Sequence, residues 1–275
     1  MPDAPFITRQ ARFASVGSTN DVVRGWLSEG TPEVCLAVAD QQTAGRGRSG
    51  RTWHAPPDAA LLLSLGFRPA WLPAEQVWRL AATVSLAMAD AAEEAAGLPD
   101  GAIRLKWPND LVVEAGEAGG GVLKLGGVLG ESDGLGSPDP RVVVGIGINA
   151  SWRREDFPAE LAPAMTSLHE ATGGRPVDQA ALLDAFLGRL EMRVVALRAG
   201  RFDLAAWNAR QVTTDREVQI EAQDGRSERV RALGVDAASG GLVVEDGEGG
   251  ERTIVVGEVR HVRVPAVGPA VGVTR

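Results

Sequence analysis

The secondary-structure pattern of this chain changes near Val212. Before that point, apolar residues recur at helical spacing in two long segments, 73–96 and 178–197, with shorter apolar runs of strand length around them. After it, short strand-like runs separated by Gly or Asp-Gly turns follow one another, a spacing typical of a small β-barrel of about 50 residues. The sequence therefore predicts a first domain over residues 1–212, a small β-domain over 213–265 and a flexible tail over 266–275.

The first domain is expected to mix helices and strands. A helix is predicted after Ser18, where Ser-Thr-Asn-Asp supplies an N-cap and an early acid, and it is predicted to end at Gly30. A shorter helix is expected over 202–210. Strands are expected at 34–39, 60–67, 103–106, 111–114, 122–131 and 141–148, and in the small domain at 217–221, 228–235, 241–245, 252–256 and 259–264.

Composition restricts the possible partners. The net charge of −8 argues against a general nucleic-acid-binding protein. The chain has no apolar run long enough to cross a membrane, and its first residues lack the basic-then-apolar plan of a signal peptide. The single cysteine, Cys35, lies in an apolar run and is expected to be buried. We therefore expect a cytoplasmic protein with neither a membrane nor a nucleic-acid partner.

Lysine is rare in this chain. Of the 28 lysine and arginine residues, only Lys106 and Lys124 are lysine, and they lie close together. Lysine offers a compact ammonium with three donors, whereas arginine offers a planar fork. A lysine that persists in an arginine-rich chain is therefore a candidate for a task that arginine cannot perform. A biased base composition that left two lysines by accident is the alternative, and the motifs around them argue against it.

A glycine- and arginine-rich segment, Gly45-Arg-Gly-Arg-Ser-Gly50, fits the G-x-G-x-x-G template of dinucleotide-binding turns. That motif needs a helix directly after it, and here two prolines follow too early. The alternative is a flexible loop that closes over an anion, with Arg46, Arg48 and Arg51 supplying charge-assisted phosphate contacts and Trp53 packing on a base. By itself the segment leaves a solvated turn equally open.

Three further motifs have an ordinary structural interpretation when each is taken alone. Lys106-Trp-Pro-Asn-Asp110 is typical of a turn between strands, yet it places a lysine beside an acid. Lys124-Leu-Gly-Gly127 begins a strand region in which a glycine lets a ligand approach the backbone. Val144-Gly-Ile-Gly-Ile-Asn149 is typical of a core strand with a bulge.

Together these segments resemble the motifs of the biotin protein ligases, in the same order and at similar intervals. The segments are Ser18-Thr-Asn20, Gln42 with Gly45-Arg-Gly-Arg-Ser-Gly-Arg-Thr-Trp53, Lys106-Trp-Pro-Asn-Asp110, Lys124-Leu-Gly-Gly-Val-Leu-Gly-Glu131 and Gly145-Ile-Gly-Ile-Asn149. The resemblance covers most of the chain, and the arginine loop is its most specific element. It implies an α/β (α+β) fold with a mixed, mainly antiparallel sheet and helices, followed by an SH3-like β-barrel. Family members that repress transcription carry an N-terminal helix-turn-helix domain, for which we expect no room before Ser18.

The resemblance also implies an activity in two steps. Biotin and ATP would form biotinyl-5′-adenylate and pyrophosphate, and a lysine of a biotin carboxyl carrier protein or domain of a biotin-dependent carboxylase would then accept the biotinyl group. The implied cofactors are ATP, biotin and Mg²⁺. The chain is expected to be a monomer or a homodimer.

Site residues follow from the same resemblance. Lys124 and Arg48 would be catalytic. Biotin binding is implied for Ser18, Thr19, Asn20, Gln42, Arg46, Gly47, Arg48, Lys124 and Gly126. Contacts to ATP or the adenylate are implied for Arg46, Arg48, Arg51, Trp53, Lys106, Asn109 and Asn149. Asp110 would help to hold Mg²⁺, although one carboxylate is a sparse metal site.

Three other functions compete with this interpretation. A lipoate-type ligase shares the fold and the adenylation chemistry, but it lacks the arginine loop and the Lys-Trp-Pro-Asn-Asp motif as they stand here. A non-catalytic biotin or nucleotide sensor would be favoured by the loss of one of the two lysines, and both are present. DNA binding is disfavoured by the net charge.

Overall fold

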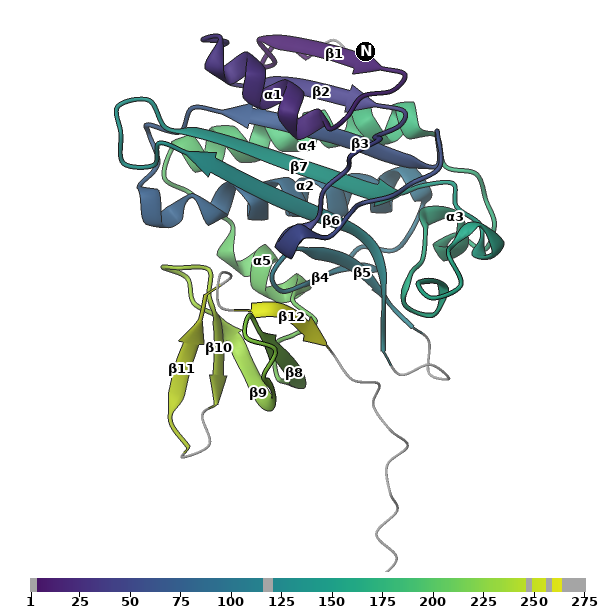
Figure 1. Cartoon of the computed structure of the whole chain (residues 1–275), viewed down its shortest axis with the longest axis vertical. Coiled ribbons are helices and arrows are strands. Elements are labelled where there is room, and N and C mark those ends of the chain that lie inside the picture. The colour runs from purple at the N-terminus through teal and green to yellow at the C-terminus, as the bar shows by residue number, and fades with distance from the viewer. Residues whose placement is uncertain (1–3, 116–120, 246–248, 256–258, 264–275) are drawn as a thin grey trace, which may run out of the picture.

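The computed structural model of the chain describes residues 4–115, 121–245, 249–255 and 259–263 (Figure 1). Its main sheet has seven strands in the order β1-β2-β3-β7-β6-β5-β4. β1 and β2 run parallel, and the other neighbouring pairs are antiparallel, which confirms the expected mixed, mainly antiparallel sheet. The strands are β1 (Arg9–Phe13), β2 (Cys35–Ala39), β3 (Ala60–Phe67), β4 (Ile103–Lys106), β5 (Asp110–Glu114), β6 (Val122–Asp133) and β7 (Arg141–Asn149).

Helices cover both faces of this sheet. α1 (Thr19–Ser28) lies on one face, and the long helices α2 (Trp78–Ala96) and α4 (Gln179–Arg198) pack together on the other (Figure 1). Two short helices, α3 (Leu168–Ala171) and α5 (Leu204–Arg210), complete the domain. α2 begins later than the expected residue 73, because a separate 3₁₀ turn follows Pro73 before the helix starts.

The two faces of the central strands differ in side-chain size. Alternate residues of β3 and β7, including Leu63 and Val144, join the core against α2 and α4. The residues between them include Ser64 and Gly145, which face Asn20 of α1, and Gly147, which faces Trp53. Small side chains on one face of two buried strands leave space above the sheet on the α1 side.

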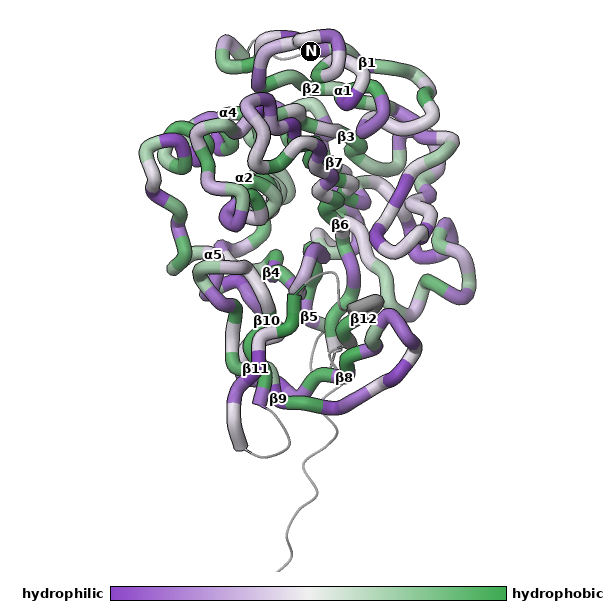
Figure 2. The backbone as a smooth tube through the Cα atoms, turned by 60° about the vertical axis from the view of Figure 1, so that its left-hand side comes forward, coloured by the Kyte–Doolittle hydropathy of each residue, from purple (hydrophilic) through white to green (hydrophobic). Residues whose placement is uncertain are grey.

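A second, five-stranded antiparallel sheet follows the first domain, with the order β11-β10-β9-β8-β12. Its strands are β8 (Arg216–Ala222), β9 (Ser227–Val235), β10 (Leu242–Glu245), β11 (Glu251–Ile254) and β12 (Val259–Arg263), and each corresponds to an expected one. In both views α5 lies between the helices of the first domain and this sheet (Figure 1, Figure 2). The sheet has its own apolar core, which includes Val218 and Leu242 and takes in Trp107 from the first domain.

Several boundaries differ from expectation. β1 was not predicted, because its sequence Arg-Gln-Ala-Arg-Phe is polar and partly exposed, as suits an edge strand. α3 is too short to produce a periodic signal. The last positions of two predicted strands, 256 and 264, and the predicted tail over 266–275 lie outside the described residues, and the domain boundaries themselves stay a prediction. Within the described ranges, no helix has the length and apolar character needed to cross a membrane.

Candidate active site

A cavity of about 250 Å³ opens above the small-residue face of the main sheet. It brings together segments that lie far apart in the sequence: the start of α1, the loop between β2 and β3, the turn before β5, and β6. The predicted site residues that line it are Ser18, Thr19, Asn20, Gln42, Arg46, Gly47, Arg48, Arg51, Trp53, Asn109 and Lys124.

The first turn of α1 supplies a buried polar floor. Gln42 accepts hydrogen bonds through Oε1 from the backbone N–H of Thr19 (2.7 Å) and from its hydroxyl (3.0 Å). The Ser64 hydroxyl lies 2.6 Å from Oγ1 of Thr19 and 2.5 Å from Oδ1 of Asn20. Ser18 precedes the helix as expected, but its side chain makes no capping hydrogen bond, which corrects the predicted cap. These side chains are held in place by one another and fit a ligand that carries both donors and acceptors.

Two glycines of β7 create the space that these groups occupy. A Cβ atom on Gly145 would lie 2.2 Å from Oδ1 of Asn20, and one on Gly147 would lie 2.7 Å from the ring of Trp53. Any larger residue would therefore displace the amide or the indole. The glycines predicted as a strand bulge instead serve close packing between β7 and two side chains of the site.

The arginine loop is a compact hairpin. Trp53 donates its backbone N–H to the Gly45 carbonyl (2.9 Å), and Gly47 donates to the carbonyl of Arg51 (2.7 Å). Only one 3₁₀ turn, Arg48–Gly50, forms within the loop, so the predicted absence of a phosphate-binding helix directly after the motif is confirmed. Burial, followed by repulsion from Arg51, lowers the pKa of Arg48. A bound anion would relieve both penalties.

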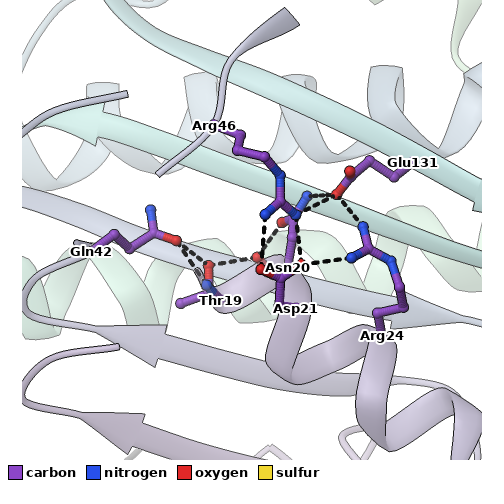
Figure 3. A network of polar contacts seen from close by, with 8 residues as sticks. Thr19, Asn20, Asp21, Arg24, Gln42, Arg46 and Glu131 are labelled. Carbon is purple, nitrogen blue, oxygen red and sulfur yellow. Dashed lines mark hydrogen bonds and ion pairs between the residues drawn. The ribbon is translucent and has the colours of Figure 1, made fainter. Parts of the chain in front are cut away.

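Arg46 points to a different set of partners (Figure 3). Its guanidinium donates to both carboxylate oxygens of Asp21 at 2.8 and 2.7 Å and to Glu131 at 3.3 Å. Glu131 also accepts from the Asn20 amide at 2.5 Å and pairs with Arg24 at 2.8 Å. The hydrogen bonds from Arg46 lower the pKa of Asp21. Neither carboxylate was predicted to belong to the site, although Asp21 directly follows Ser-Thr-Asn and Glu131 ends the motif that begins at Lys124.

Both lysines converge on one buried carboxylate. Asp110 lies 2.6 Å from Nζ of Lys124 and 3.1 Å from Nζ of Lys106, one lysine on each oxygen. Its burial opposes ionisation, but the two ammonium groups outweigh it and hold the pKa of Asp110 well below its usual range. Lys124 lies 5.6 Å from the ring centre of Trp53, within cation–π range, and it faces the cavity.

Four predicted residues do not line the cavity. Gly126 packs against the backbone of β7, where its Cβ would lie 2.7 Å from the Gly147 carbonyl, and the cavity wall is formed by Gly127 instead. Lys106 and Asp110 lie behind Lys124. Asn149 is buried and donates to the Thr166 carbonyl at 2.9 Å. The structure thus places these four in a supporting layer.

The side chains do not suit a magnesium site held by the protein alone. Both oxygens of Asp110 are already paired with ammonium groups. Among the described residues, no group of three or more His, Cys, Asp or Glu side chains is arranged to hold a metal ion.

One wall of the cavity consists of residues that were not predicted from the sequence to belong to the site. It comes from the segment between β7 and α3 and contains Trp152, Phe157, Pro158, Leu161 and Met165. The rings of Trp152 and Phe157 stack with centres 4.6 Å apart. The indole N–H groups of Trp152 and Trp53 are buried without a hydrogen-bond partner in the protein. An apolar wall with such donors fits a ring that carries acceptor atoms.

The fold and the cavity define a pocket for a small polar ligand together with an anionic group. Residues 13–149 match the model of the Biotin/lipoate A/B protein ligase family. The chain is 33% identical over 254 residues to the biotin–[acetyl-CoA-carboxylase] ligase of Mycobacterium tuberculosis (strain ATCC 25618 / H37Rv), covering 91% of this chain and 88% of that protein. The solved structure of the biotin protein ligase from Aquifex aeolicus in complex with biotin and ATP matches with a TM-score of 0.75 at 26% identity, covering 94% of this chain and all of the other.

A partial match adds to these. The chain is 34% identical over 178 residues to the bifunctional ligase/repressor BirA of Bacillus subtilis (strain 168), covering 65% of this chain and 51% of that protein. The chain therefore belongs to the biotin/lipoate A/B protein ligase family.

Proposed function

We propose that this chain is an ATP-dependent biotin protein ligase that forms biotinyl-5′-adenylate and passes the biotinyl group to a lysine of a biotin carboxyl carrier protein or domain. One observation supports this proposal above the others. A polar floor, the guanidinium groups of Arg48 and Arg51 and the ammonium group of Lys124 all line the same cavity. The names of the relatives in M. tuberculosis and A. aeolicus agree with this activity.

The polar floor suits the ureido ring of biotin. The buried Thr19 and Asn20 and the partly buried Gln42 offer both donors and acceptors. Polar groups left without hydrogen bonds in this setting would be costly, which favours a ring that carries both kinds of group. The apolar wall around Trp152 and Phe157, with Trp53 nearby, offers surfaces for flat ring systems.

The first chemical step brings two anions together. The biotin carboxylate attacks the α-phosphorus of ATP, a new C–O–P anhydride forms, and the bond to pyrophosphate breaks. Fixed positive charge has to offset the repulsion. In this proposal Lys124 meets the carboxylate and the α-phosphate, while Arg48 and Arg51 hold the phosphate from the loop. Asp110 and Lys106 position the ammonium of Lys124 from behind.

In the second step the acceptor lysine attacks the mixed anhydride, an amide forms and AMP leaves. The loop over the cavity would keep water from the anhydride until then. Mg²⁺ would enter as the counter-ion of the ATP phosphates. The acceptor would belong to a biotin-dependent carboxylase in the cytoplasm, and the ligase would act as a monomer or homodimer, without nucleic acid or membrane.

The test uses the purified chain with ATP, Mg²⁺ and biotin. Pyrophosphate release is followed with and without a biotin carboxyl carrier domain, and lipoate replaces biotin in a parallel assay. We expect biotin-dependent release and a mass gain of one biotinyl group on one acceptor lysine. Release with lipoate alone would overturn the substrate assignment, and binding of biotin without any release would leave a sensor.

A further inference from the structure

The arginine loop is connected to α1 and β6 through Arg46. Asp21 lies in the first turn of α1 and Glu131 lies on β6, and both carboxylates accept hydrogen bonds from the guanidinium of Arg46 (Figure 3). A planar guanidinium on a carboxylate in a two-bond arrangement is a strong and directional contact. The loop is thereby connected to a helix and to a strand of the main sheet.

These contacts compete with the role that the family resemblance gives to Arg46. Its guanidinium donates three hydrogen bonds to carboxylates, and the negative charges of Asp21 and Glu131 more than balance its single positive charge. Arg24 balances the remaining charge, since it pairs with Asp21 at 2.6 Å and with Glu131 at 2.8 Å. A guanidinium in a closed network of two acids and two bases is a poor receptor for a phosphate, because the acids repel the incoming anion.

Holding Arg46 fixes the groups that follow it. Arg48 is two residues further along, and the hairpin hydrogen bonds between Gly47 and Arg51 and between Gly45 and Trp53 make the loop move as a unit. Glu131 also accepts from the Asn20 amide, so one carboxylate joins the loop to the polar floor. A shift of Arg46 would therefore carry Arg48 and Trp53 away from the cavity.

We propose that Asp21 and Glu131 are positioning residues that clasp the arginine loop over the cavity through Arg46, so that Arg46 closes the loop while Arg48 and Arg51 meet the phosphate. Only the expected effect of the clasp on catalysis rests on the proposed function. The closure itself can be measured without any ligand.

The first experiment is limited trypsin digestion of the ligand-free protein, because the loop contains three arginine cleavage sites. Asp21→Asn, Glu131→Gln and the double variant keep all three sites. We expect at least tenfold faster cleavage within the loop in the double variant and unchanged cleavage elsewhere. Glu29→Gln is the matched control. Glu29 also forms an exposed ion pair, with Arg9 at 3.1 Å, but it is remote from the loop. Equal loop cleavage in all variants would overturn the clasp.

The second experiment separates a clasp from an anion ligand by a double-mutant cycle. Arg46→Gln is placed in the wild type and in the Asp21→Asn/Glu131→Gln background, and biotin-dependent pyrophosphate release is compared. A clasp predicts that Arg46→Gln causes no further loss once its carboxylates are neutral. A further loss of tenfold or more in that background, or a gain in activity from neutralising the carboxylates, would show that Arg46 binds the anion and would overturn the assignment.

Failure of the proposed function gives a different result. If the wild type releases no pyrophosphate, the ligase assignment fails, whereas the trypsin experiment still decides whether the loop is clasped. Should the double variant melt below the assay temperature, Glu131→Gln alone supports both experiments, because Glu131 lies on β6 and a glutamine there can still accept the hydrogen bond from the Asn20 amide.

Discussion

Lys124 and Asp110 form the shortest ion pair at the base of the cavity, with Nζ 2.6 Å from Oδ1. Lys106 occupies the other oxygen at 3.1 Å. One buried carboxylate thus holds two cations side by side, and one of these faces the cavity. Two guanidinium groups share a carboxylate elsewhere in the chain, since Arg193 and Arg210 both pair with Asp90, so sharing alone does not require lysine. Asp110 is more deeply buried than Asp90, and compact ammonium groups suit that smaller space.

Replacing Lys124 by arginine keeps the charge and tests the shape. The planar guanidinium would have to fit between Asp110 and the Trp53 ring, which already lies 5.6 Å from Nζ. We expect a loss of about 100-fold or more in pyrophosphate release, the scale seen when one preorganised charge-stabilising donor is removed. Arg12→Lys, at an exposed ion pair with Asp40, is the control for the exchange of cation type. Near-normal release by Lys124→Arg would mean that charge alone suffices.

Asp110→Asn should produce a pH-dependent loss of stability. The pKa of Asp110 is depressed in the folded protein, so its stabilising contribution is fully present above the ordinary carboxyl value of about 4 and is lost as the pH falls below it. Removing one partner of a buried charge group costs about 3–5 kcal/mol at pH 7. Urea unfolding of both proteins from pH 7 down to pH 3 should show the difference narrowing below about pH 4. A difference that stays constant with pH would contradict this electrostatic account.

The glycines of β7 can be tested one at a time. A methyl group on Gly145 would displace Asn20, and one on Gly147 would displace Trp53. We expect Gly145→Ala to raise the KM for biotin and Gly147→Ala to raise the KM for ATP, each by about tenfold or more, which corresponds to about 1.4 kcal/mol of lost binding. Gly130→Ala on β6 is the matched control, because its Cβ would meet only Ala81 at an ordinary 4.0 Å. Equal effects on both substrates would indicate general damage to the sheet.

Arg48→Gly should release the reactive intermediate. Arg48 lines the cavity in the middle of the loop that covers it, and glycine removes both its charge and its contacts. We expect biotin-dependent pyrophosphate release to continue while bystander lysines on added albumin become biotinylated. A streptavidin blot of that mixture, compared with the wild type, measures the effect. A clean blot would argue against a role for Arg48 in retaining the adenylate.

The packing of Trp107 should link the stability of the second sheet to that of the turn before β5, which borders the site. Its side chain is 1% exposed within the core of the second sheet, and its indole N–H donates to the Gly240 carbonyl at 2.9 Å. Trp107→Ala should cost about 3–5 kcal/mol, as for other large buried side chains. Hydrogen exchange should show the loss concentrated in β8–β10 and in the turn before β5. Trp107→Phe keeps most of the packing, so it should retain most of the protection from hydrogen exchange that Trp107→Ala loses.

The local pattern of the chain determined much of the fold and some of the site. Apolar periodicity was sufficient to find α2, α4 and the buried strands, because side-chain alternation follows from backbone geometry. The lysine and arginine motifs identified the side chains with a chemical task. By contrast, the polar, partly exposed β1 has no strong sequence signal, since pairing with β2 is what makes it a strand.

Only the tertiary structure decided which side chains meet. Asp21 and Glu131 are distant in sequence, and nothing in their local context shows that both contact Arg46. A regular strand would place Gly126 on the same face as Lys124, yet a register shift between β5 and β6 at this point breaks the alternation, and Gly127 lines the cavity instead. Sequence specifies residue types and their periodicity, whereas contacts between distant segments depend on strand order and register, which form only when the whole sheet assembles.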